Sequence, residues 1–344
     1  MKRVSIKDVA REAGVSTTTV SYVLNHHPGE TISADTCARV WAAVKSLNYI
    51  PNLSARSLSS RKSNLIGVVI PQTEPGREFM FSNPFYGELL SAIEYTARVN
   101  GYHLLLSGTE ADQNYVQIAR TRGVDGIVIV GTYPSESLSE LKQMDIPVVL
   151  IDSYVNDDAF HTIGIEDKAG ARLATEYLLG KGHRQIAFIS GSLREYGVAF
   201  KRFEGYQEAL RGAGIPLDME NVFSGAVDFD YGVSTAYKLI KRGVATAAFV
   251  TADMLGMGLI KGLHQLGKSV PRDLSVVSFD DVYLAQMCDP SLTTIHQDIG
   301  EKGRRAVEMI IESKDETPRK KKELILPITL VERASVRELT EAER

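Results

Sequence analysis

The 344-residue sequence predicts a small all-helical head followed by two α/β lobes with parallel sheets. Apolar residues recur at helical spacing within the first 50 residues. From residue 65 onward, short β-rich apolar runs alternate with helical stretches, as in parallel sheets covered on both faces. Charge is divided in the same way, because residues 1–64 hold nine Lys/Arg against four Asp/Glu while the whole chain has a net charge of −4. A basic head on an acidic body indicates a polyanion as the partner of the head.

The head begins with two short predicted helices joined by a tight turn. Ser5 and Asp8 can form a capping box at the first helix, and Gly14 can end that helix in a left-handed conformation. Ser16 is a suitable N-cap for the second helix. The apolar stripe of the first helix comprises Ile6, Val9, Ala10 and Ala13, and that of the second comprises Val20, Val23 and Leu24. This arrangement predicts a helix-turn-helix.

The second helix opens with four hydroxyl residues, although threonine is a poor helix former. Short polar side chains let a helix approach DNA closely, and hydroxyl and amide groups can read base edges in the major groove. The residues expected to contact DNA here are Ser16, Thr17, Thr18, Ser21, Tyr22 and Asn25. The alternative is a helical hairpin at the start of an enzyme. A third predicted helix, capped by Ser33, favours a compact DNA-binding module, with Cys37, Val40, Trp41, Val44 and Leu47 as its apolar stripe.

The sequence resembles the lactose-repressor (LacI/GalR) family of bacterial transcription regulators along essentially the whole chain, up to about Val336. The resemblance rests on "VSIKDVAREAGVSTTTVSYVLN", "YIPNLSARSL", "NPFYGELLSAIE", "VDGIVI", "ATEYLLGKGHRQIAFISG", "SVVSFDD" and "SLTTIHQD". It implies a two-lobe core like that of type I periplasmic binding proteins, with an effector cleft between the lobes. It also implies a homodimer that binds a pseudo-palindromic operator in double-stranded DNA.

The expected domain limits follow from this resemblance and from the strand–helix series. Residues 1–50 form the head, 51–64 a hinge, 65–336 the effector-binding core and 337–344 a tail. Within the core, residues 65–163 with 293–325 are expected to form one lobe, and 164–292 with 326–336 the other. The chain is therefore expected to cross between lobes near residues 163, 293 and 325.

The Ser-rich segment 51–64 could be a flexible tether or a short helix that orders only on DNA. The resemblance implies the helix, lying in the minor groove of the operator. It assigns DNA contacts to Asn52, Ala55, Arg56 and Leu58, with Leu58 as an apolar wedge that kinks the duplex. Arg56 is expected to neutralise a phosphate.

The expected effector site lies where strands of the two lobes end. Asp152 and Asp280 end predicted strands, and Phe85 and Tyr86 begin the helix after the first strand. Carboxylates, a forked arginine and aromatic rings suit a polyhydroxylated ring, which indicates a sugar or sugar derivative. The resemblance places effector contacts at Phe85, Tyr86, Asp152, Arg202, Val227 and Asp280. The alternative is that the acids cap helices and Arg202 pairs with Glu204 or Glu208.

Two departures from the family pattern leave the effector open. Ala252-Asp253 stands where many sugar-responsive members have Asn-Asp, so one polar contact is expected to be missing. The segment before Arg202 is one residue longer than usual, which shifts the alignment of Arg194 and Tyr196. A nucleobase effector or a protein corepressor therefore remains an alternative.

Other function classes find little support in the sequence. The glycines at 256 and 258 fall inside a predicted helix rather than at a strand–helix junction, which disfavours a dinucleotide site. The seven His lack metal-ligand spacing, so neither catalysis nor a bound metal or cofactor is expected. Without a signal peptide or a long apolar stretch, and with Cys37 and Cys288 in separate domains, the expected location is the cytoplasm. The alternative of a periplasmic sugar-binding protein would need a signal peptide and would have no DNA-binding head.

Overall fold

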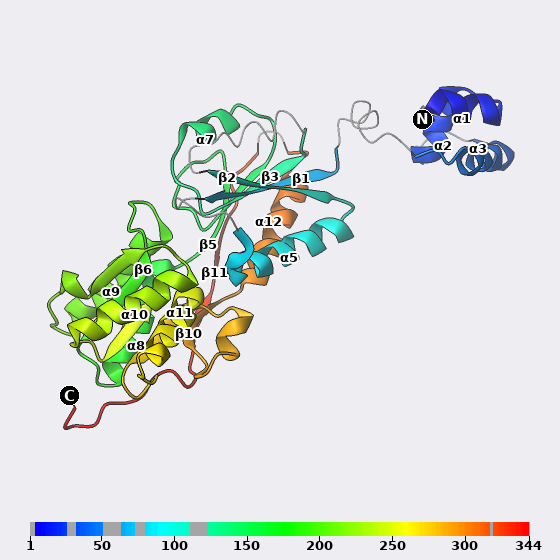
Figure 1. The fold of residues 1–344 in the computed structure, drawn as a ribbon. Helices are drawn as coiled ribbons and strands as arrows, with labels where there is room; N and C mark the ends of the chain where they lie inside the picture. The colour runs from blue at the N-terminus through cyan, green and yellow to red at the C-terminus, as the bar shows by residue number, and fades with distance from the viewer. Residues whose placement is uncertain are drawn as a thin grey trace. The chain divides into compact units, whose positions relative to one another are not determined.

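The computed structural model describes residues 4–25, 32–50, 63–72, 80–110, 123–316 and 319–343. Its chain divides into two compact units, residues 1–63 and residues 64–344, which are described separately (Figure 1). The hinge residues Asn52, Ala55, Arg56 and Leu58 lie outside the described residues.

The first unit contains three helices, α1 (Ile6–Ala13), α2 (Thr17–Asn25) and α3 (Ala34–Ser46). The backbone N–H of Ser5 donates to Asp8 Oδ2 at 2.9 Å, and Gly14 ends α1 at φ 65°, as predicted. The N–H of Thr19 donates to Ser16 Oγ at 3.0 Å, which confirms the cap of α2. Six apolar side chains from the predicted stripes are buried in a shared core: Val9, Ala10, Ala13, Val20, Val23 and Val40.

The prediction for Trp41 is wrong, because 47% of this residue is exposed. The buried stripe of α3 runs through Val40 and Ala43, with Val44 and Leu47 packed beside it. That stripe follows the i, i+3, i+4, i+7 pattern, and residue 41 lies at its edge.

The second unit holds two six-stranded sheets, each of which defines a lobe. The first lobe comprises β1 (Leu65–Gln72), η1 (Met80–Ser82), α5 (Pro84–Val99), β2 (His103–Glu110), β3 (Gly126–Val130), α7 (Glu136–Leu141), β4 (Val148–Ile151), β5 (His161–Ile165), α12 (Ile299–Ser313) and β11 (Glu323–Leu326). Its strand order is β11-β5-β4-β3-β1-β2, with all strands parallel. Residues of β1 alternate between its two faces: Ile66 and Val68 pack in the cluster that includes α5, and Val69 packs in the cluster that includes α7.

The second lobe repeats this arrangement. It comprises α8 (Asp167–Gly180), β6 (Ile186–Gly191), α9 (Val198–Gly212), η2 (Met219–Asn221), β7 (Val222–Gly225), α10 (Phe229–Arg242), β8 (Ala247–Val250), α11 (Asp253–Gln265), β9 (Ser275–Asp280), η3 (Tyr283–Gln286), β10 (Thr293–Gln297) and β12 (Ile328–Val331). Its order is β12-β10-β9-β8-β6-β7, and only the pairing of β12 with β10 is antiparallel among the described strands.

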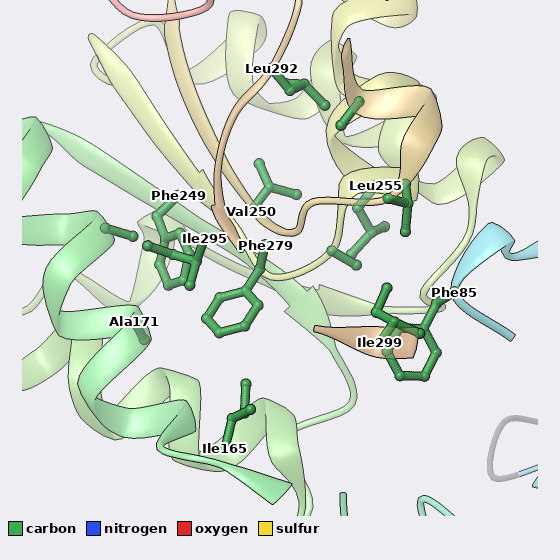
Figure 2. Packing of buried hydrophobic residues seen from close by; sticks show 14 of the residues in the cluster. Phe85, Ile165, Ala171, Phe249, Val250, Leu255, Phe279, Leu292, Ile295 and Ile299 are labelled. Carbon is green, nitrogen blue, oxygen red and sulfur yellow. The ribbon is translucent and has the colours of Figure 1, made fainter. Parts of the chain in front are cut away.

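Helices cover both faces of the second sheet. Gly170 of α8 faces the ring of Phe279, and Gly256 of α11 faces the neighbouring Ser278. Because adjacent strand residues point to opposite faces, α8 and α11 lie on opposite sides of β9. Phe279 lies in the large core cluster of this unit, as does Phe85 from the first lobe (Figure 2).

The chain passes between the lobes three times, between β5 and α8, between β10 and α12, and between β11 and β12. The expected second crossing near residue 293 is placed too early, because β10 pairs with β9 and β12 of the second sheet. The crossing follows Gln297. Beyond β12, the hydroxyl of Ser335 donates to the Val276 carbonyl and the N–H of Leu339 donates to the Lys181 carbonyl, so the end of the chain is attached to the second lobe.

Candidate functional site

The DNA-facing surface predicted for α2 is polar and accessible. Ser16, Thr17 and Thr18 are exposed, and Ser21 and Tyr22 are half-buried. Val20 and Val23 anchor the opposite face of the helix in the core. Asn25 is the last residue of α2. The weak helix formers Thr17 and Thr18 therefore lie on the exposed side of α2.

A cavity of about 200 Å³ lies between the two lobes, at the carboxyl ends of their strands. The six residues predicted to contact an effector all line it: Phe85, Tyr86, Asp152, Arg202, Val227 and Asp280. Ligands of open α/β sheets bind at this edge, because helices and loops leave a crevice beyond the strand ends. The structure therefore brings together, around one cavity, side chains that are up to 195 positions apart.

The aromatic wall of the cavity comes from the start of α5. The N–H of Phe85 donates to Asn83 Oδ1 at 3.1 Å, and Pro84 begins the helix. This cap fixes the first turn, where the rings of Phe85 and Tyr86 meet edge to face with centroids 5.5 Å apart. Such rings offer an apolar surface to one side of a ligand.

Arg202 is the central cation of the site, and only 7% of its side chain is exposed. Its Nε donates to Asp167 Oδ1 at 2.8 Å, and its Nη1 donates to the Thr251 carbonyl at 2.6 Å. Its Nη1 also lies 3.5 Å from Asp280 Oδ1, and its Cζ lies 3.6 Å from the centroid of the Phe279 ring. A guanidinium held on this many sides is preorganised for a ligand.

The alternative pairing of Arg202 with Glu204 or Glu208 is wrong. Lys201 pairs with Glu204 at 2.8 Å, and Lys168 pairs with Glu208 at 3.0 Å. Both acids are more accessible than Arg202, which lies on the buried side of α9.

The two acids of the site occupy strained backbone. Asp152 has a φ of 51° and Asp280 a φ of 112°, values that L-residues adopt at a cost of about 1–3 kcal/mol. Strained backbone of this kind is kept only where the surrounding structure holds it in place, and it is common at functional sites. Burial raises the pKa of Asp280 to about 6, although the positive charge of Arg202 opposes this rise.

Reasoning from the sequence missed several residues of the site. Gln297 lines the cavity, and its Nε2 donates to Asp280 Oδ1 at 2.7 Å. Lys302 of α12 donates to Asp152 Oδ1 and to Gln297 Oε1. The hydroxyl of Tyr154 donates to the other oxygen of Asp167 at 2.8 Å. The sequence does contain one signal for Lys302. It is a charged residue on the buried, largely apolar stripe of α12, between Ile299 and Ala306.

Both departures from the family pattern fall at the cavity. Ala252 lines it, whereas the buried Asp253 accepts hydrogen bonds from Ser278, Thr294 and the N–H of Val282. Arg194 and Tyr196, whose alignment is shifted by the longer loop, also line the cavity. The predicted helical position of Gly256 and Gly258 is confirmed, since both lie within α11. Among the described residues, no group of His, Cys, Asp and Glu suits a metal ion.

Comparison with known proteins identifies both units. The model of "Bacterial regulatory proteins, lacI family" matches residues 5–52, and that of "Periplasmic binding protein-like domain" matches residues 175–336. The HTH-type transcriptional repressor PurR of Vibrio vulnificus (strain CMCP6) is 35% identical over 315 residues, which cover 90% of this chain and 91% of that protein. The ribose operon repressor of Escherichia coli (strain K12) is 34% identical over 338 residues, with 96% and 99% covered.

The structural comparison agrees. The lac repressor dimer bound to operator and the anti-inducer ONPF superimposes with a TM-score of 0.81 at 28% identity, covering 98% of this chain and 100% of that chain. No helix in the described parts of the chain has both the length and the apolar character needed to span a membrane.

A helix-turn-helix head joined to a two-lobed core with an interlobe cavity defines a DNA-binding transcription regulator rather than an enzyme. The chain belongs to the lacI family of bacterial regulatory proteins.

Proposed function

We propose that this regulator is a cytoplasmic homodimeric repressor whose operator affinity changes when a sugar or sugar derivative binds in the interlobe cavity. The observation that carries the ligand proposal is the convergence of Arg202, Asp280, Asp152 and Gln297 on one small cavity with an aromatic wall. Hydroxyl groups can donate to the carboxylates and accept from the guanidinium and the amide. A cavity of about 200 Å³ suits a ligand the size of one sugar ring.

The relatives support this ligand class. One of them is a ribose operon repressor, and the lac repressor structure contains a small anti-inducer together with operator. A ligand controls DNA binding only if it binds one conformation of the protein more tightly than another. Two lobes joined by three short crossings offer such conformations, because a change in the angle between the lobes moves the start of β1.

The DNA side of the proposal rests on α2 and on the segment before β1. Ser16, Thr17, Thr18, Ser21, Tyr22 and Asn25 are proposed to read the major groove of each half-site. Asn52, Ala55, Arg56 and Leu58 are proposed to contact the minor groove as a hinge that orders on DNA. A dimer would present two such heads to a pseudo-palindromic operator. The similar lac repressor structure is likewise a dimer bound to operator.

A two-stage experiment tests the proposal. A thermal-shift screen of sugars, sugar phosphates, nucleosides and purines first finds what raises the unfolding temperature of the full chain. Fluorescence anisotropy with a selected operator duplex then measures operator affinity with and without that ligand. We expect a sugar to bind and to change operator affinity at least several-fold. A purine or nucleoside as the sole ligand would replace the sugar assignment, and a ligand without effect on operator affinity would refute the regulatory one.

A further inference from the structure

Lys302 is a charged residue at a position that the helix periodicity reserves for apolar side chains. It lies on the buried stripe of α12 with Ile299, Gly303 and Ala306, and it is fully buried. This stripe packs closely, because a Cβ at Gly303 would lie 2.8 Å from the Leu89 carbonyl oxygen of α5. Burying an ammonium in such a place is costly unless partners compensate its charge.

The partners of Lys302 come from both lobes. Asp152 follows β4 of the first lobe, and Gln297 ends β10 of the second lobe. An ammonium only donates hydrogen bonds, so the atom of Gln297 that faces it is the oxygen. The amide nitrogen of Gln297 then faces Asp280, to which it donates at 2.7 Å. Lys302 thus fixes the orientation of an amide that lines the cavity.

Lys302 also supplies the positive charge that pairs with a carboxylate of the cavity. Six charged side chains of the described residues line the cavity or contact one that does: Asp152, Asp167, Asp280, Arg194, Arg202 and Lys302. Among them, Arg202 pairs with Asp167 and Asp280, and Lys302 pairs with Asp152. Lys302 engages Oδ1 of Asp152, and none of the described residues donates to Oδ2. That oxygen is left as an acceptor whose charge is already compensated.

We propose that Lys302 is a positioning residue that makes the cavity selective for an uncharged hydroxylated ligand. It compensates Asp152, fixes the amide of Gln297 and links the two lobes beneath the ligand. The ligand itself contacts Asp152 and Gln297 rather than Lys302. This inference rests on the proposed sugar-binding function and narrows its ligand class.

The first test measures ligand selectivity of the full chain. Thermal shifts and calorimetry compare uncharged sugars (ribose, glucose, galactose), amino sugars (glucosamine, galactosamine) and sugar phosphates (ribose 5-phosphate, glucose 6-phosphate). In the wild type we expect an uncharged sugar to bind best. Lys302→Met leaves the charge of Asp152 uncompensated, so the affinity for amino sugars should rise about tenfold relative to uncharged sugars. Lys261→Met, at an exposed position of α11, is the matched control and should keep the wild-type order.

The second test needs no ligand. Unfolding temperatures are measured for Asp152→Asn, Lys302→Met and the double variant. Asp152→Asn leaves the buried ammonium of Lys302 without its carboxylate, so the unfolding temperature should fall by several degrees. Adding Lys302→Met should restore more than half of that loss. A loss that is merely additive in the double variant would overturn the pairing.

The two tests separate the inference from the proposed function. If wild type binds no sugar of any charge, the proposed function fails, and the ligand-free measurement still decides whether Lys302 serves Asp152. If a sugar phosphate binds best, or if Lys302→Met keeps the wild-type order of ligands, the function stands and the inference about Lys302 is wrong.

Discussion

Arg202 Nε donates to Asp167 Oδ1 at 2.8 Å, and this bond ties the cavity to the point where the chain first enters the second lobe. Asp167 begins α8 directly after that crossing. Gln297 lies at the second crossing and is connected to Arg202 through Asp280. The polar groups under the cavity thus join two of the three connections between the lobes.

Replacing Arg202 should affect both ligand binding and stability. Arg202→Met leaves the buried Asp167 and Asp280 without their cation, so the free energy of unfolding should fall by about 3–5 kcal/mol. Operator binding at low temperature should persist without its ligand response. Chemical denaturation and operator anisotropy measure the two effects. Arg211→Met, at an exposed position of the same helix, should change neither, and a normal ligand response in Arg202→Met would refute the site.

Operator choice should depend on the exposed residues of α2. Exchanging Thr17, Thr18 and Tyr22 should alter preference among operator variants by about 1–3 kcal/mol for each base that is no longer recognised, because these side chains are proposed to read base edges. Affinity for a scrambled duplex should stay nearly constant. Selection from a randomised operator library measures the preference. An unchanged preferred sequence would show that another element reads the bases.

Operator binding should weaken steeply as salt concentration rises, because the basic head releases counterions from phosphates. Arg56→Ala should weaken binding and make the logarithmic salt slope shallower by about one unit per half-site. Leu58→Ala should weaken specific binding and leave the slope and the ligand affinity of the free protein unchanged. Titrations at several salt concentrations separate these effects. Wild-type operator affinity in Leu58→Ala would favour a flexible tether.

The stability of the core should depend on the protonation of Asp253. Burial and the nearby negative charge of Asp280 raise the pKa of Asp253 from 3.8 to about 8 in the folded chain. The folded state then binds more protons than the unfolded state between these values, so this contribution is complete below about pH 4 and is lost as pH rises through 8.

Asp253→Asn is the variant that tests this dependence. An amide can accept from the N–H of Val282 and donate to Ser278 and Thr294 without losing a partner. Denaturation of both proteins from pH 5 to 8 should show the wild type losing stability relative to the variant. A constant difference across this range would mean that Asp253 is ionised throughout.

Gly258 should be essential for packing rather than for ligand binding. A Cβ at this position would overlap the Phe229 carbonyl oxygen of α10, so Gly258→Ala should cost about 1–3 kcal/mol or more as the helices separate. Gly212→Ala is the control, since a Cβ there meets nothing within 4 Å. Thermal unfolding compares the two. Equal stability of both variants would contradict the close packing of α10 and α11.

Local signals predicted what depends on local interactions. The caps at Ser5 and Ser16 and the helix end at Gly14 follow from neighbouring residues, and the structure confirms them. Lys302 was missed because its significance arises from Asp152, which lies 150 positions earlier and reaches it only through the fold. Trp41 was wrongly assigned to the core because it is apolar and lies next to Val40 in the sequence. Its position on α3 is at the margin of the buried stripe, where a large side chain stays partly exposed.

One outer strand of each sheet comes from a single short stretch near the end of the chain. β11 borders β5 in the first sheet, and β12 borders β10 in the second. On the ribosome, neither lobe can therefore complete its sheet until that stretch has been translated. A chain that ends before Glu323 would leave β5 and β10 unpaired on one side, and each of these largely buried strands could pair with a strand of another polypeptide. Degradation of such incomplete chains would therefore protect the cell from their aggregation.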